Sequence, residues 1–277
     1  MKLLETAPAS GGMPLKRELR PMYGLSFLVA ALVAATSLGG LLFQPIFYPT
    51  EELRHSFISN DVVNLFIVLP VLLGAMALAR RGKLVGLLFW PGALLCVPYN
   101  AIAYTVATAS PWLSVVYLVQ IVSSGYTISR LVAAIDESVV QQRLAGAVPE
   151  KFAGGVLAGL SGFFFLRSAV LLVRALTGSL VVARAEVATL IADIVAAPVW
   201  IAGGIVLWRK RATGYVVGAG LLFQLSILFA GLLIFFVLQP LMTAAPFPLE
   251  DFVVILVMGL ICFVPFGLYT YGIIRRS

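Results

Sequence analysis

Long apolar runs, separated by short polar segments, follow one another along almost the whole chain. Each run has about 20 residues or more, which is the length that an α-helix needs to cross a bilayer. Only helices and closed barrels satisfy every backbone polar group in lipid, and runs this long and this uniformly apolar are typical of helices. We therefore predict an all-α, polytopic integral membrane protein with eight transmembrane helices. The predicted spans are 23–44, 60–79, 84–108, 112–134, 153–176, 184–208, 213–238 and 251–274.

The composition agrees with this pattern. Hydrophobic residues make up 61% of the 277 residues and charged residues only 11%, whereas an ordinary soluble domain has about 25% charged residues. The mean hydropathy of +1.04 applies to the whole length, so it does not describe one buried core in a soluble protein. The lipid bilayer is therefore the partner that the sequence predicts most directly.

The basic residues predict an orientation. The net charge is +7, and 15 of the 19 lysines and arginines fall on one side of the predicted topology, together with both termini. The positive-inside rule makes this side cytoplasmic, and we expect a multi-pass protein of the plasma membrane. Because topology explains the positive charge, nucleic-acid binding has no separate support.

The chain divides into two groups of four spans. We expect a flexible basic tail over 1–20, a first membrane half over 21–135, a cytoplasmic linker over 136–152 with room for an interfacial helix, and a second half over 153–277.

The two halves share a sequence pattern in their second spans. Each has an aspartate, then a proline, then a basic cluster, so that Asp61 corresponds to Asp193 and Pro70 to Pro198. Both halves start on the same side, so a duplication would be parallel. Independent recurrence of glycines and basic loops explains the pattern equally well, and both interpretations stay open.

Charged residues inside the fifth and sixth spans predict ion pairs. Arg167 and Arg174 are two helical turns apart, as are Glu186 and Asp193, so each pair lies on one helix face. In an antiparallel hairpin, Arg174 would meet Glu186 near the surface and Arg167 would meet Asp193 roughly 10 Å deeper. Two interpretations are open: a structural ladder of ion pairs, or a ligand or proton site.

Polar side chains in the outer halves of several spans predict a pocket that opens toward the outside. Arg167 would hold an anionic or hydrogen-bonding group of a ligand, and Asp193 would tune or neutralise the arginine. The candidate ligand-binding residues are Asn64, Asn100, Tyr104, Tyr117, Gln120, Arg167 and Asp193.

The fourth span carries the clearest polar stripe. Its members are three or four residues apart, so they share one helix face. Contact between helices explains the small members, whereas a wet cavity explains the large ones better. The stripe consists of Ser114, Tyr117, Gln120, Ser124, Thr127 and Arg130.

Asp61 has a simpler explanation at the start of the second span. In SNDVVNLFIVLP, Ser59, Asn60 or Asp61 is placed to cap the helix, and we favour capping over a functional role for Asp61.

Metal and cofactor chemistry has no support in the sequence. His55 is the single histidine, and Cys96 and Cys262 stand alone within apolar runs. Neither a metal or haem site nor a disulfide is expected. The chain has no HExxH, GxSxG or P-loop pattern.

The sequence therefore predicts a carrier or binder of a small or lipid-like solute. One alternative is a membrane-embedded enzyme in which Asp61 and Asp193 act as acid or base on a lipid-borne substrate. The other is a sensor or assembly subunit without chemistry of its own. A carrier needs polar side chains that reach both faces, whereas an enzyme needs a one-sided pocket with a base or nucleophile.

Overall fold

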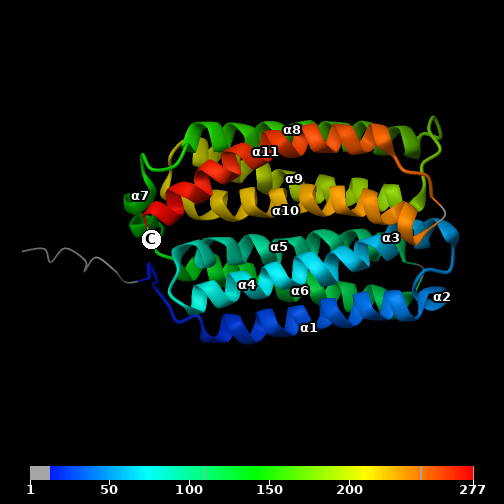
Figure 1. The fold of residues 1–277 in the computed structure, drawn as a ribbon, viewed down its shortest axis with the longest axis horizontal. Helices are drawn as coiled ribbons and strands as arrows, with labels where there is room; N and C mark the ends of the chain where they lie inside the picture. The colour runs from blue at the N-terminus through cyan, green and yellow to red at the C-terminus, as the bar shows by residue number, and fades with distance from the viewer. Residues whose placement is uncertain (1–12, 109, 244, 277) are drawn as a thin grey trace, which may run out of the picture.

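The computed structural model describes residues 13–108, 110–243 and 245–276. Within these residues the chain is all-helical, and eight of its helices are long and apolar enough to cross a membrane (Figure 1). The predicted number of spans is therefore confirmed. The predicted bounds also agree to within a few residues, except at the start of the second span. The spans are α1 (Arg20–Leu42), α3 to α4 (Glu51–Arg80), α5 (Leu84–Ala107), α6 (Pro111–Ala134), α8 (Glu150–Leu176), α9 (Arg184–Trp208), α10 (Ala212–Met242) and α11 (Leu249–Arg275).

The second span begins earlier than the apolar pattern indicates. It consists of α3 (Glu51–Val63), a π-helical turn (Asn64–Val68) and α4 (Leu69–Arg80). Thr50 caps its first turn by accepting a hydrogen bond from the backbone N–H of Leu53. Asp61 therefore lies inside the helix, and the prediction that it caps the second span is wrong.

The π turn ends next to Pro70. Its backbone bond runs from the N–H of Leu69 to the carbonyl of Asn64, so this turn holds one residue more than an α turn. Proline lacks an N–H group, and its ring clashes with the carbonyl four residues earlier, which disturbs the regular helix here. Single π turns occur often at functional sites, and this one begins at a predicted ligand-binding residue.

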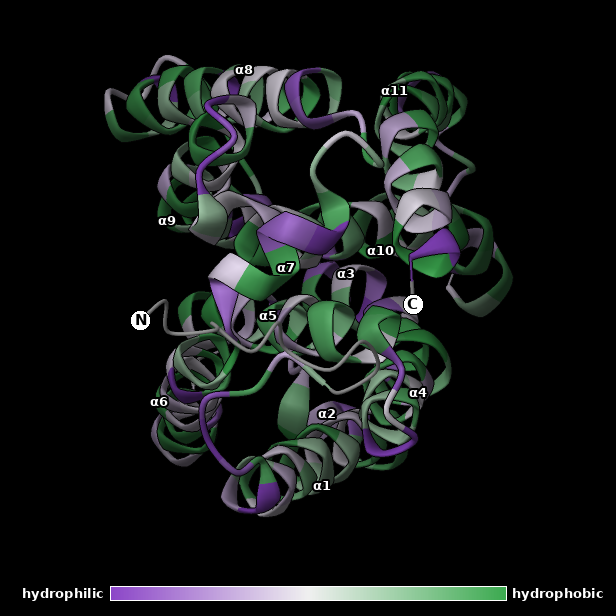
Figure 2. Cartoon of the chain, turned by 90° about the vertical axis from the view of Figure 1, so that its left-hand side faces the viewer, coloured by the Kyte–Doolittle hydropathy of each residue, from purple (hydrophilic) through white to green (hydrophobic). Residues whose placement is uncertain are grey.

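The spans form two four-helix groups that meet along α5 and α10. In Figure 2 the helices α1, α4, α5 and α6 lie together, and α8 to α11 form the other group. In the apolar part of α5, 72% of the residues are buried, compared with 17% in α8 and 22% in α11. Helix α5 is therefore the centre of the assembly, while α8 and α11 expose apolar faces of the kind that lipid covers.

The contact between α5 and α10 depends on two glycines. A Cβ atom on Gly92 would lie 2.0 Å from the carbonyl oxygen of Gly220, and one on Gly220 would lie 3.3 Å from the Gly92 nitrogen. Small residues let helix backbones approach this closely in membranes. The two halves thus meet backbone to backbone at one point near their shared centre.

The turns that join the second and third span of each half have the same geometry. In the first half, Arg81, Gly82 and Lys83 donate to the carbonyls of Ala77, Ala79 and Leu78. The second half repeats these bonds, residue for residue.

There Arg209, Lys210 and Arg211 donate to Ile205, Leu207 and Val206. Lys210 adopts a φ of 55°, and its counterpart Gly82 has a φ of 74°. A left-handed lysine is uncommon, so the match concerns an unusual backbone conformation.

The described ends of the chain lie at the same end of the bundle (Figure 1). The predicted tail over 1–20 falls partly outside the described residues. Its last part is attached to the protein, because Lys16 donates to the carbonyl of Ala134 and Asp136 donates to that of Pro14.

The predicted linker contains the short helix α7 (Glu137–Leu144). Asp136 caps it by accepting bonds from the backbone of Ser138 and Val139. The hydroxyl of Ser138 also donates to this carboxylate and holds the pKa of Asp136 below its usual value.

The glycine contact gives a stability prediction. Gly92→Ala should lower the thermal unfolding midpoint of the purified chain in detergent, because the new methyl group must push α10 away. Overpacking of this kind costs about 1–3 kcal/mol. The matched control is Gly125→Ala on α6, where no atom lies within 4 Å of the new carbon. Equal midpoints for the two variants would show that α5 and α10 do not meet at Gly92.

Candidate functional site

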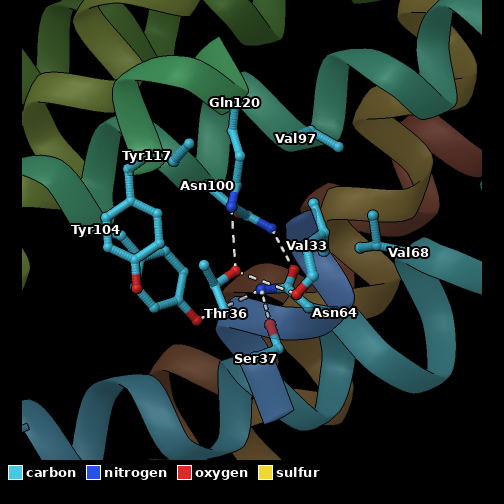
Figure 3. Close-up of a pocket in the computed structure, with 11 residues that line it drawn as sticks. Val33, Thr36, Ser37, Asn64, Val68, Val97, Asn100, Tyr104, Tyr117 and Gln120 are labelled. Carbon is cyan, nitrogen blue, oxygen red and sulfur yellow. Dashed lines mark hydrogen bonds between the residues drawn. The ribbon is translucent and has the colours of Figure 1, made fainter. Parts of the chain in front are cut away.

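A small polar cavity lies inside the first half, between α1, the second span, α5 and α6. Its volume of about 10 Å³ is room for about one water molecule. Figure 3 shows polar side chains from all four spans pointing toward it. Five of the seven predicted ligand-binding residues line this cavity. Its lining consists of Val33, Thr36, Ser37, Asn64, Val68, Val97, Asn100, Ala101, Tyr104, Tyr117 and Gln120.

A chain of hydrogen bonds leads from the cavity to Asp61. Asn100 donates its amide N–H to Asn64 Oδ1 over 2.7 Å, and the Asn64 amide reaches the Tyr104 hydroxyl at 3.4 Å. The Tyr104 hydroxyl donates to Asp61 Oδ1 at 2.8 Å. Tyr48 donates to the other carboxylate oxygen at 2.5 Å. Asp61 is therefore the final acceptor of the network.

Asp61 is 1% exposed. Its position beside α1 depends on Gly40, where a Cβ atom would lie 2.1 Å from Asp61 Oδ2. An uncompensated charge in the bilayer interior costs several kcal/mol, so the tyrosine hydroxyls are needed to make this position tolerable.

On the other wall of the cavity, Gln120 binds α1. Its amide donates to the Thr36 hydroxyl at 3.1 Å (Figure 3) and to the carbonyl of Leu32 at 3.3 Å. This contact brings α6 to α1 and closes the ring of four spans around the cavity.

Two layers of side chains bound the cavity along the long axis of the helix bundle. Toward the end that holds the termini lie Val33, Val68 and Val97, each about one helical turn beyond a polar lining residue of its own helix. Toward the other end lies an aromatic layer of rings in contact. Its ring centroids are 5.1 Å apart for Tyr104 and Tyr117, 4.6 Å for Phe57 and Tyr104, and 5.7 Å for Tyr48 and Phe57.

Asp193 lies away from this cavity. It is 8% exposed and accepts hydrogen bonds from the Tyr99 hydroxyl at 2.8 Å and the Ser168 hydroxyl at 3.0 Å. Tyr99 precedes the cavity residue Asn100 on α5 but faces the second half. Asp193 therefore connects α9 to α5 and α8, and it is not part of the cavity wall.

The structure does not form the predicted ion-pair ladder. An ion pair does form between Lys210 and Glu150, at 3.6 Å, but neither residue belongs to the predicted ladder. Arg167 is exposed on α8, while Asp193 is bonded to neutral hydroxyls. The spacing places each pair of charges on one helix face, but Arg167 is exposed and lies farther than 4.0 Å from Asp193, on which it acts through its charge alone.

The outer rung of the ladder is absent as well. Arg174 and Glu186 are both exposed and lie farther than 4.0 Å apart. Two exposed charges near a helix end reach water without a partner, which explains why they need not pair.

Only part of the polar stripe on α6 belongs to the cavity. Tyr117 and Gln120 line the cavity, whereas Ser124 and Thr127 donate their hydroxyls to carbonyls of their own helix. These two small residues lie at helix contacts, as the alternative interpretation of the stripe expected. A polar route through the described residues therefore does not follow α6 beyond Gln120.

Sequence reasoning missed Asp61, Tyr48, Thr36 and Ser37 as parts of this site. Asp61 lies one turn from Asn64 on the same helix, and this spacing was the available signal. It was lost because the polar segment EELRHS hides the true start of the second span.

Metal-ligating residues do not gather in the described part of the chain, where no group of three His, Cys, Asp or Glu side chains is placed to hold an ion. Cys96 and Cys262 are both buried free thiols.

Comparison with protein-family models, curated proteins and solved structures finds no match for this chain. The fold and composition define the class as a multi-pass helical membrane protein. The candidate site within it is a small polar cavity connected to a buried carboxylate.

The hydrogen-bond network gives a second stability prediction. Tyr104→Phe removes a hydroxyl that contacts Asp61, Asn60 and Asn64. Because Asp61 then loses a donor within the protein interior, we expect a loss of about 1–3 kcal/mol, seen as a lower thermal unfolding midpoint. Tyr126→Phe on the exposed face of α6 is the control and should change little. If both variants unfold like the wild type, Tyr104 does not support the carboxylate.

Proposed function

We propose that the protein is a carrier or binder of a small polar solute, and that the cavity in the first half is its binding site. The observation that carries this proposal is a polar cavity closed on one side by aromatic rings and on the other by valines. A carrier needs a midplane site with a barrier on each side. The volume of about 10 Å³ favours a small solute over a lipid-like one.

The proposed site consists of Asn64, Asn100, Tyr104, Tyr117 and Gln120, with Asp61 behind Tyr104. Arg167 and Asp193 are left out of the proposed site because neither is among the residues that line the cavity. The enzyme and the sensor stay alternatives, without a specific observation in their favour.

We also propose that the two halves arose by duplication. The equal turns and the Gly92–Gly220 contact support a duplication. The matching turn residues, the two glycines and the pair Pro70 and Pro198 are all separated by the same number of positions in the sequence. The π turn adds one residue to the second span of the first half. When the two halves are aligned, residues that precede this turn therefore move by one position, and Asn64 takes the place of Asp61 as the counterpart of Asp193. The polar position would then be ancestral, and a carboxylate replaces the amide in the second half.

For the membrane location we propose the plasma membrane with cytoplasmic termini. The basic residues of the turns support this orientation. They include Arg80, Arg81, Arg209, Lys210 and Arg211, at the end where the described termini also lie.

Accessibility of the cavity tests the carrier proposal without a known solute. In a chain with Cys96→Ala and Cys262→Ala, a cysteine introduced as Asn100→Cys should react with a membrane-impermeant thiol reagent from either side of sealed vesicles. We expect labelling from both sides because a carrier opens the aromatic layer and the valine layer in turn. Val119→Cys, on the exposed face of α6 beside Gln120, is the control and should stay unlabelled.

Two other outcomes decide against the carrier. Labelling of Asn100→Cys from one side alone would leave a binder, and a folded variant that never reacts would reject a solute site at this cavity.

A further inference from the structure

A carboxyl group lies behind the cavity without a neighbouring cation to pair with it. The lining residues are all neutral, and Asp61 lies one hydrogen bond behind Tyr104. Among the described residues, no lysine, arginine or histidine nitrogen lies within 4.0 Å of the Asp61 carboxylate. Arg54 lies beyond Tyr48, where its guanidinium donates to the Tyr48 carbonyl at 3.0 Å.

The hydrogen bonds around Asp61 suit an ionised carboxylate. Each of its oxygens accepts a bond from a tyrosine hydroxyl, and an ionised carboxylate has acceptor positions only. Hydroxyl groups lower the cost of burying the charge but do not neutralise it. In surroundings of low dielectric constant, a cation in the adjacent cavity would interact strongly with this carboxylate.

The cavity also offers acceptors that its own side chains leave free. Asn100 and Gln120 use their amide N–H groups as donors, and their side-chain oxygens accept no hydrogen bond from the described residues. A ligand that fits must therefore donate hydrogen bonds. Amide, hydroxyl and ring groups surround this space in Figure 3.

The aromatic rings bound the cavity but pack on one another. Tyr104 and Tyr117 both line the cavity, with ring centroids 5.1 Å apart, and Phe57 packs against Tyr104 at 4.6 Å. The ligand class is therefore indicated by the carboxylate and the free acceptors.

We propose that the solute is a small ammonium-type cation, either ammonium itself or a short primary amine, which Asp61 neutralises. This inference rests on the proposed function, because it names the solute class of the same cavity. A metal cation fits less well, since it needs several oxygen ligands at once. Here the oxygens of Asn64 and Tyr104 already accept bonds from neighbouring amides.

The proposal differs from the role that the sequence predicted for Arg167. Arg167 was expected to hold an anionic or hydrogen-bonding group of the ligand, but it lies on an exposed face of α8, outside the cavity lining. The charge that remains beside the cavity is the carboxylate of Asp61.

Thermal unfolding of the full chain tests this inference. The chain is placed in nanodiscs of zwitterionic lipid, and sodium chloride is replaced by methylammonium chloride at constant ionic strength. Ligand binding at saturation should raise the unfolding midpoint of the wild type by about 2–4 °C. Asp61→Asn should abolish this rise. The control Asp193→Asn changes a buried carboxylate outside the cavity and should keep it.

Competition on the wild type keeps the test valid if Asp61→Asn fails to fold. Radiolabelled methylammonium should bind saturably, and ammonium should displace it, whereas neutral acetamide and anionic acetate should not. Equal displacement by acetamide, equal stabilisation by sodium, or no binding would overturn the inference. Labelling of Asn100→Cys from both sides together with no methylammonium binding would reject the cation and leave the carrier standing.

Discussion

The hydrogen bonds that Tyr48 and Tyr104 donate to Asp61 are the interaction on which the interior of the first half depends. A carboxylate with no donors is not tolerated inside a bilayer, so the spans must bring hydroxyl groups to it. Tyr104 does so from α5, and Tyr48 does so from the segment that follows the short helix α2 (Gln44–Phe47). Gly40 leaves the space on α1 that the carboxylate fills. One buried charge thereby fixes how these segments pack around the cavity.

Helix α5 serves both halves of the molecule. Tyr104 bonds Asp61 in its own half, while Tyr99 bonds Asp193 across the interface. The two tyrosines are five positions apart, so they point from different faces of the helix. The Gly92–Gly220 contact lies on the same helix, nearer to its first residue than either tyrosine. A displacement of α5 would therefore act on both carboxylate sites, as the proposed carrier function requires.

The sequence predicted the spans well because the physics that sets them is local. A run of apolar residues of bilayer length has few alternatives. The inward face of α6 followed from spacing in the same way, and Tyr117 and Gln120 do line the cavity. Asn64 and Asn100 also meet, since polar side chains at similar depth in neighbouring spans find one another.

The wrong predictions concern side-chain contacts that depend on how one helix is rotated relative to its neighbour. Spacing places Arg167 on a definite face of α8 but does not say which neighbour that face meets. Asp193 does meet α8, but through Ser168, the residue after Arg167, and its other partner is Tyr99, from a span much earlier in the chain. No local pattern marks either choice. Asp61 was misjudged because polar residues extend α3 beyond the apolar run, so a buried position resembled a helix start.

An experimental structure of the full chain, crystallised from a lipid phase, tests the central claim most directly. The account predicts that the Asp61 carboxylate lies inside the first half, with the hydroxyls of Tyr48 and Tyr104 within hydrogen-bond distance and density for a small bound species between Asn64, Asn100 and Gln120. An Asp61 side chain that faces lipid or bulk water, or one that is paired with an arginine or lysine, would contradict the account.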